Sequence, residues 1–316
     1  MKNFIQNLNK AEIHLHIEGT LEPKMLLSLA KSNQVKIPYS SIEEVQNAYK
    51  FSNLQSFLNL YYQGLAVLQT EEDFYNLMYS YLQKAHLQNV KVAEIFFDPQ
   101  AHTSRLIAWQ TFMNGFKKAM IDAKANLGIN SHLIMCFLRH LPEKDALKTL
   151  EESLDYRNDI IGVGLDSSEL GNPPELFKTV FKQAKDYNFK LVAHAGEEAD
   201  HTYIWQAIDI LGVDRVDHGN WAIKDKELMQ RLAKDKIPLT MCPLSNEYLK
   251  TFKVQKDSYP LQTFLDYGII ATINSDDPAY FGGYINENFE FIQKQLNLKE
   301  DTLKLLANNS LQAVLR

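Results

Sequence analysis

The chain of 316 residues has little of what marks several classes of protein. Its two cysteines, Cys136 and Cys242, cannot form a disulfide framework and suit a reducing compartment. The 13 glycines and 10 prolines are too few for a collagen-like or linker-rich chain. No window approaches the run of about 18 apolar residues that spans a bilayer, and the first residues lack the apolar stretch of a secretory signal. We therefore expect a cytoplasmic protein that does not enter a membrane.

A basic surplus is also missing. The sequence has 33 Lys and Arg against 39 Asp and Glu, which gives a formal net charge of −6. Proteins that bind the phosphate backbone of nucleic acids carry a basic footprint, so we expect no nucleic-acid partner. With 45% hydrophobic and 23% charged residues, the composition is that of a folded chain with a large core.

Short apolar runs alternate with longer helix-like stretches from end to end. Runs that are apolar throughout indicate strands buried on both faces, as in a parallel sheet. Eight such runs lie at 11–15, 90–97, 131–137, 160–165, 190–193, 215–216, 238–241 and 269–273, the sixth being the weakest. Eight strand–helix units without a linker predict an α/β fold, a single (β/α)8 TIM barrel over residues 1–316. A doubly wound sheet is the alternative, but no G-x-G-x-x-G follows the first strand.

Helix signals lie between these runs. Thr70 followed by Asp73 is typical of a capping box and predicts a helix that continues to residue 88. Gly128 is a plausible end for a helix over 104–127. The region 22–68 holds two or three helices, more than a simple crossover needs. We interpret it as a helical insertion after the first strand that covers a site.

In a (β/α)8 barrel the chemistry lies just after the strand ends. His14 and His16 follow the first strand two residues apart, so both imidazoles can face one metal ion. His194 ends the fifth strand, and Asp276 and Asp277 follow the eighth. Three histidines and one or two aspartates thus meet on one face of the predicted barrel.

Three imidazoles and a carboxylate, with a place left for water, describe catalytic zinc. Zinc lowers the pKa of bound water and makes hydroxide available. Glu197 fits a second acid that moves protons without binding metal, and His218 can orient the hydroxide. The fourth run ends in LDSSE at 165–169, without the lysine that bridges two metals in related barrels, so we expect one ion. Iron or manganese remain alternatives for the same ligands.

The motifs KAEIHLH at 10–16, HAGE at 194–197, DHG at 217–219 and NSDDP at 274–278 occur in this order. Together they resemble the adenosine and adenine deaminase family of metal-dependent amidohydrolases, over essentially the whole chain. The resemblance implies that one zinc ion is bound by His14, His16, His194 and Asp276. It further implies that Glu197 protonates the purine ring at N1, that His218 assists the attacking hydroxide, and that Asp277 accepts a hydrogen bond at N7. Attack at C6 and release of ammonia follow from it.

The segments IEGTLEP at 17–23, FFDPQAHT at 96–103, GLDSSE at 164–169 and PAYFGGY at 278–284 are similar to the adenine-specific branch of this family. The substrate implied is a free purine base, adenine, converted to hypoxanthine in purine salvage. Adenosine-specific members have Asp where Glu18 stands, and we expect Glu18 to occupy ribose space or to serve the free base.

Several residues keep two interpretations. Ser168 and Glu169 can line the purine edge near N3, although an acid at Glu169 is equally a helix cap. We interpret His102 and Arg105 as a structural pair, and Cys242 as a small buried hydrophobe.

Alternatives to adenine remain open: adenosine, an N6-substituted adenine or an aminofutalosine-type nucleoside. A catalytically silent, zinc-stabilised binding protein is an alternative of a different class. The sequence does not indicate the oligomeric state.

Overall fold

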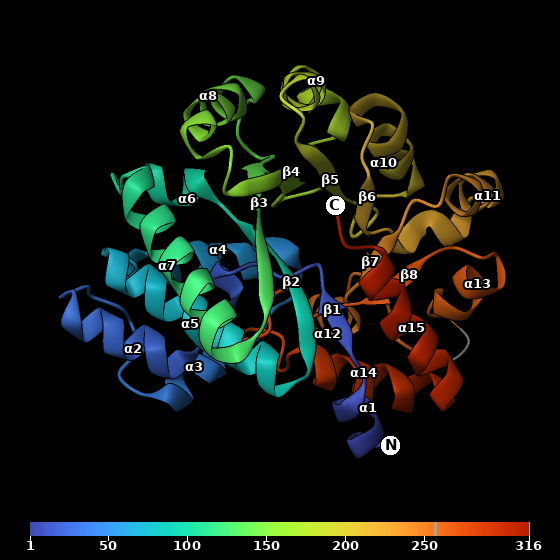
Figure 1. The fold of residues 1–316 in the computed structure, drawn as a ribbon, viewed down its shortest axis with the longest axis horizontal. Helices are drawn as coiled ribbons and strands as arrows, with labels where there is room; N and C mark the ends of the chain where they lie inside the picture. The colour runs from blue at the N-terminus through green and yellow to red at the C-terminus, as the bar shows by residue number, and fades with distance from the viewer. Residues whose placement is uncertain (256–257, 316) are drawn as a thin grey trace.

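The computed structural model describes residues 1–255 and 258–315. Eight parallel strands form one sheet in chain order, and helices surround it (Figure 1). The strands are β1 Lys10–Glu12, β2 Val90–Phe97, β3 Asn130–Leu138, β4 Ile160–Asp166, β5 Lys190–Ala195, β6 Arg215–His218, β7 Leu239–Met241 and β8 Ala271–Ile273. All eight predicted strands are present, and the predicted (β/α)8 barrel is confirmed.

The helices follow the predicted alternation. They are α1 Lys2–Asn7, α2 Pro23–Ser32, α3 Ile42–Ala48, α4 Leu54–Gly64, α5 Glu71–Leu87, α6 Pro99–Thr103, α7 Trp109–Leu127, α8 Glu143–Ser153, α9 Lys178–Asp186, α10 His201–Gln206, α11 Lys226–Asp235, α12 Pro243–Leu249, α13 Leu261–Asp266, α14 Ile285–Leu296 and α15 Glu300–Gln312. The capping box of Thr70 and Asp73 is present at α5. Gly128 ends α7 in the left-handed conformation, as predicted. No helix of the described residues is long and apolar enough to cross a membrane.

Two predicted boundaries were wrong. The helix expected over 104–127 begins only at Trp109, because Leu106 has a positive φ of 64° that separates α6 from α7. The first strand was expected over 11–15 but ends at Glu12, and only isolated bridges at Leu15 and His16 continue the pairing.

The barrel closes where the segments after β1 and β8 meet. The backbone N–H of Asp276 donates to the carbonyl of His14 at 3.1 Å, and the N–H of His16 donates to the carbonyl of Asp276 at 3.1 Å. The hydrogen bonds that join the two ends of the sheet therefore also bring three of the predicted metal ligands together.

The barrel interior contains both apolar and charged side chains. Phe96, Ile134, Cys136 and Val192 form a buried apolar cluster. Glu94 lies two residues before Phe96, and since side chains two apart on a strand share a face, it also points inward. It pairs with the buried guanidinium of Arg215. Burying a charge costs free energy unless the charge is paired, so Glu94 and Arg215 stabilise each other inside the barrel.

Candidate active site

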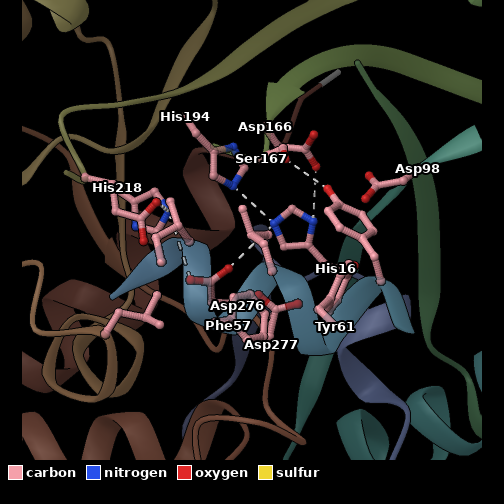
Figure 2. Close-up of a pocket in the computed structure, with 15 residues that line it drawn as sticks. His16, Phe57, Tyr61, Asp98, Asp166, Ser167, His194, His218, Asp276 and Asp277 are labelled. Carbon is pink, nitrogen blue, oxygen red and sulfur yellow. Dashed lines mark hydrogen bonds and ion pairs between the residues drawn. The ribbon is translucent and has the colours of Figure 1, made fainter. Parts of the chain in front are cut away.

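The four predicted metal ligands lie close together in the structure. His14 and His16 follow β1, His194 lies on β5, and Asp276 follows β8; their ligand atoms all lie within 4.8 Å of one another and all four residues are buried. The Nε2 atoms of His16 and His194 are 3.1 Å apart. Oδ1 of Asp276 lies 3.4 Å from Nε2 of His14 and 3.5 Å from Nε2 of His16. Figure 2 shows His16, His194 and Asp276 pointing toward one another.

The donor atoms fit a metal ion. Nε2 of His14 is buried and has no hydrogen-bond partner among the described residues. Burial lowers the pKa of His16 to about 4 and that of His194 well below its ordinary value, so both imidazoles are neutral near pH 7. Neutral imidazole is the form that binds metals, and facing lone pairs without a cation between them would repel. The structure therefore contains a candidate metal site of three histidines and one aspartate.

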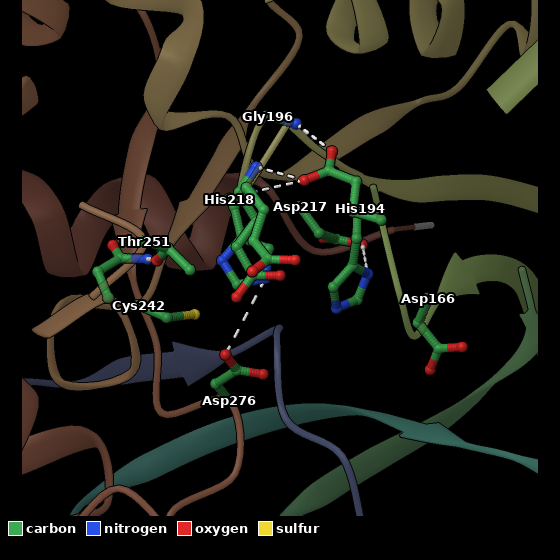
Figure 3. A network of polar contacts seen from close by, with 12 residues as sticks. Asp166, His194, Gly196, Asp217, His218, Cys242, Thr251 and Asp276 are labelled. Carbon is green, nitrogen blue, oxygen red and sulfur yellow. Dashed lines mark hydrogen bonds and ion pairs between the residues drawn. The ribbon is translucent and has the colours of Figure 1, made fainter. Parts of the chain in front are cut away.

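The outer nitrogens of these imidazoles are held by other side chains. Nδ1 of His14 lies 2.7 Å from Oγ1 of Thr240, and that hydroxyl donates to Oδ1 of Asp217 at 2.9 Å. Because the hydroxyl hydrogen is used on Asp217, Nδ1 of His14 must donate to Thr240, which leaves Nε2 as a lone pair. Oδ2 of Asp217 also lies 3.7 Å from Nδ1 of His194 (Figure 3).

Asp217 thus supports His14 through the Thr240 hydroxyl and lies within ion-pair distance of His194 without a hydrogen bond to it. Arg215 donates to its Oδ1 at 3.1 Å, so the ion pair inside the barrel holds Asp217 in place. Carboxylates that fix the outer nitrogen of metal-binding histidines set their orientation and tautomer. Sequence reasoning included Asp217 in a motif but gave it no role, and it missed Thr240; the position of Asp217 at the end of β6 was the available signal.

Glu197 and His218 lie beside the four ligands. Nε2 of His218 is 3.5 Å from Oε2 of Glu197 and 4.0 Å from Oδ2 of Asp276. Burial, reinforced by the charge of Asp276, raises the pKa of Glu197 well above its ordinary value. Burial lowers the pKa of His218 to about 3. The raised pKa of Glu197 favours its protonated carboxyl form, and the lowered pKa of His218 favours its neutral imidazole, so the pair offers a proton donor and a proton acceptor.

Glu169 supports the loop that carries Glu197. Its carboxylate is fully buried and accepts four backbone N–H bonds, from Gly196 at 2.6 Å, Glu197 at 3.0 Å, Glu198 at 2.7 Å and Ala199 at 2.9 Å. Gly196 permits this turn, since its φ is +72° and a Cβ there would lie 2.6 Å from Cδ1 of Ile204. Both oxygens of Glu169 are occupied, so the structure places it behind the site and not on the predicted purine edge.

Asp277 faces the same cavity from the segment after β8. Its Oδ1 is buried without a hydrogen-bond partner among the described residues, and burial together with Asp276 raises its pKa well above the ordinary value. Gly19 allows this position, because a Cβ there would lie 2.0 Å from Oδ1 of Asp277. His218 and Asp276 have left-handed backbones with φ of 65° each, a strain that commonly accompanies functional sites.

Glu18 and Ser168 do not line the cavity. Oε1 of Glu18 lies 2.8 Å from Nε2 of His102, whose Nδ1 lies 2.8 Å from Nη2 of Arg105. Arginine only donates, so Nδ1 of His102 accepts and its Nε2–H donates to Glu18. The structural pair of His102 and Arg105 is therefore present, with Glu18 as its third member. Ser168 instead donates to Oε1 of Gln55 at 2.5 Å on the surface.

Cys242 lies outside the predicted ligand set. It lies near His14, His218 and Asp276, but burial raises the pKa of its thiol well above the ordinary value. The thiol donates weakly to the carbonyl of Thr240 at 3.7 Å. A buried, neutral thiol behaves as a small hydrophobe, as expected from the sequence.

Helix α4 forms one wall of the cavity, and further polar residues follow β2 and β4. The lining comprises His16, Leu54, Phe57, Leu58, Tyr61, Tyr62, Asp98, Asp166, Ser167, His194, Glu197, His218, Leu249, Asp276 and Asp277. The α4 residues lie within the region 22–68 that the sequence analysis expected to cover a site. Sequence reasoning missed Asp98 and Tyr61 as cavity residues, although Asp98 directly follows a predicted strand.

A (β/α)8 barrel with this candidate metal site and a neutral acid beside it defines a metal-dependent hydrolase of the amidohydrolase type. The sequence profile of the adenosine deaminase family matches residues 9–315, and the chain belongs to that family. It is similar to an adenine deaminase of Psychrobacter cryohalolentis, with 55% identity over 313 residues that cover 99% of this chain and 94% of that protein.

Solved structures agree with this assignment. The crystal structure of an adenine deaminase from Arthrobacter aurescens has a TM-score of 0.95 and 43% identity, covering 98% of this chain and 94% of that one. An amidohydrolase from Burkholderia ambifaria, solved with bound Zn, has a TM-score of 0.90 and 27% identity, covering 99% and 87% of the two chains. The chain is thus an enzyme, a deaminase with the fold of these relatives.

Proposed function

We propose that the protein deaminates adenine hydrolytically to hypoxanthine and ammonia, with one Zn2+ ion per chain, in purine salvage in the cytoplasm. The observation that carries the proposal is that a His3Asp ligand set, Glu197 with its raised pKa and Asp277 lie together at one cavity, and that Oδ1 of Asp277 has no hydrogen-bond partner among the described residues. Adenine is supported by the names of relatives that match nearly the full chain. Zinc is supported by the imidazole ligands and by the zinc-bound relative.

His14, His16, His194 and Asp276 would hold the zinc ion, which when bound supplies a hydroxide nucleophile at neutral pH. The neutral imidazoles and the orphaned Nε2 of His14 fit this role. The supports at Asp217 and Thr240 keep the lone pairs of the ligands directed at the ion.

Glu197 and His218 would move the protons. Glu197 holds a proton at neutral pH and donates it to N1 of adenine, which increases the electrophilic character of C6. Nε2 of His218, unprotonated, accepts a hydrogen bond from the attacking water and orients it toward C6. Phe57 and Leu58 on α4 line the same cavity and exclude bulk water from these transfers.

Asp277 would bind N7 of the purine. In the usual 9H tautomer of adenine, N7 carries no hydrogen, so a hydrogen bond there requires a donor. The raised pKa of Asp277 keeps its carboxyl protonated, and we therefore reverse the direction expected from the family resemblance: Asp277 donates to N7. Deamination does not require Asp277 to transfer this proton, so Asp277 binds and orients the purine.

The test compares adenine and adenosine side by side on zinc-loaded protein, followed by the loss of absorbance of the 6-aminopurine. We expect adenine to be the better substrate by kcat/KM. Faster turnover of adenosine, an N6-substituted adenine or an aminofutalosine-type nucleoside would identify that compound, and not adenine, as the substrate. Bound zinc without turnover of any of them would identify a silent binding protein.

A further inference from the structure

The cavity has a polar side that the proposed reaction leaves without a role. Nε2 of His16 faces His194, whereas Nδ1 of His16 lies 3.5 Å from Oδ2 of Asp166. Asp98 lies next to these groups, and His16, Asp98 and Asp166 have polar atoms within 4.8 Å of one another. The imidazole of His16 therefore separates the metal side of the cavity from a carboxylate side; Figure 2 shows Asp166 above this imidazole and Asp98 to its upper right.

Asp98 is one of the two carboxyl groups on this side, and each of them has a buried oxygen without a hydrogen-bond partner among the described residues. It is 1% exposed, it lines the cavity, and its Oδ1 has no hydrogen-bond partner among the described residues. It occupies the N-cap position of α6 without making a capping hydrogen bond. Its backbone N–H donates to Oε1 of Glu18 at 3.2 Å, and its side chain shares a hydrogen bond with the carboxyl group of Asp166. A buried acceptor without a donor costs free energy, and a ligand that supplies a donor would remove that cost.

A donor without a partner lies nearby. Tyr61 on α4 lines the cavity, and its hydroxyl is buried with no hydrogen-bond partner among the described residues. Tyr61 and Asp98 line the same cavity. The carboxylate side therefore offers one acceptor and one donor to a ligand.

Adenine presents the complementary pair. In the proposed function, N1, C6 and N7 face Glu197, the metal site and Asp277. The edge that remains carries N3, an acceptor, beside N9–H, a donor. In a nucleoside the sugar is bonded to N9, so this donor does not exist.

We propose that Oδ1 of Asp98 accepts a hydrogen bond from N9–H of the bound purine, and that this contact selects free purine bases over 9-substituted ones. The inference deepens the proposed function and rests on it. It does not depend on the ionisation of Asp98, because an oxygen of either the carboxylate or the carboxylic acid keeps a lone pair for N9–H. Tyr61 is placed to donate to N3 in the same complex.

The test uses adenine and 9-methyladenine, which keeps the reacting atoms but lacks N9–H. For the wild type we expect a preference for adenine on the order of 10⁴-fold in kcat/KM, because a buried polar group left unpaired rejects an analogue strongly. Asp98→Ala should lower kcat/KM for adenine by about 10- to 100-fold without lowering it for 9-methyladenine. Asp98→Asn retains an oxygen acceptor and should keep more of the preference than Asp98→Ala.

The control is Asp186→Ala, which removes an exposed carboxylate on α9 and should leave kcat/KM for both substrates unchanged. If Asp98→Ala lowers kcat/KM equally for both substrates, the inference is overturned and Asp98 is a structural residue. A second metal ion per chain that is lost in this variant would reassign Asp98 as a ligand.

A wild type that deaminates 9-methyladenine within about tenfold of adenine would also overturn the inference, even if no variant folds. All of these outcomes are compatible with rapid turnover of adenine by the wild type. Adenine turnover separately tests the proposed function, so the two failures can be distinguished.

Discussion

The carboxylate of Glu169 accepts a hydrogen bond from the backbone N–H of Glu197 at 3.0 Å. The two acids come from neighbouring strand ends, and one holds the main chain of the other without touching its side chain. The proposed proton donor is therefore positioned by a buried carboxyl group that also accepts from the adjacent N–H groups of the same loop.

Glu169→Gln tests this relationship. An amide has one acceptor oxygen in place of two, and its NH2 group would face backbone donors. We expect kcat for adenine to fall by about 10- to 100-fold, the usual effect of removing a supporting contact, with little change in zinc content or KM. The pH profile should shift as well, because the position of Glu197 changes. Unchanged kcat and profile would exclude the role; the exposed Glu175→Gln is the control.

Glu197→Gln should retain zinc and adenine binding but lose about 10²- to 10⁴-fold in kcat, because only the proton is removed. In the wild type, the raised pKa of Glu197 means that activity falls as pH rises through that pKa and the proton is lost. This alkaline limb should be absent from the residual activity of the variant. The neighbouring Glu198→Gln serves as the control. Wild-type turnover in Glu197→Gln would remove Glu197 from the mechanism.

Asp217→Asn should weaken metal binding. Asp217 holds the hydroxyl that binds His14, and its Oδ2 lies 3.7 Å from Nδ1 of His194, so its loss removes one support and changes the charge beside a second ligand. We expect zinc affinity to fall by about 10- to 100-fold, measured by competition with a chelator, and activity to return at high zinc concentration. An affinity equal to the wild type would show that Asp217 does not orient the ligands.

Glu12 should make stability depend on pH. Burial raises its pKa from 4.5 to about 8, and its carboxyl is hydrogen-bonded to Ser275. Since the folded state holds this proton where the unfolded state does not, the stabilisation is complete below pH 4.5 and is lost as pH rises through about 8.

Glu12→Gln mimics the protonated form and should remove this loss. The free energy of unfolding, measured with denaturant at about pH 5 and about pH 9, should fall less in the variant than in the wild type. Each unit of pKa shift corresponds to about 1.4 kcal/mol, so the difference should be measurable. Parallel pH dependence in both proteins would contradict the prediction.

The fold was predictable because a parallel barrel buries its strands on both faces. That burial produces continuous apolar runs, which are visible in one dimension for most strands. The exception is the short β6, whose sequence RVDH contains Val216 as its one apolar residue. The errors fell where local geometry overrides composition: a left-handed Leu106 ends one helix, and the two histidines after β1 leave the regular ladder. Neither backbone angle nor isolated bridge has a sequence signature of its own.

The sequence by itself determined which residues stand at the strand ends, and hence that His14, His16, His194 and Asp276 meet. Only the tertiary structure decided how the other polar groups are used. Asp217 lies beside two ligands, Glu169 holds a loop, and Oδ1 of Asp98 has no hydrogen-bond partner among the described residues. These roles depend on which atoms approach across strands far apart in the chain, and that is set by barrel closure and side-chain packing in three dimensions.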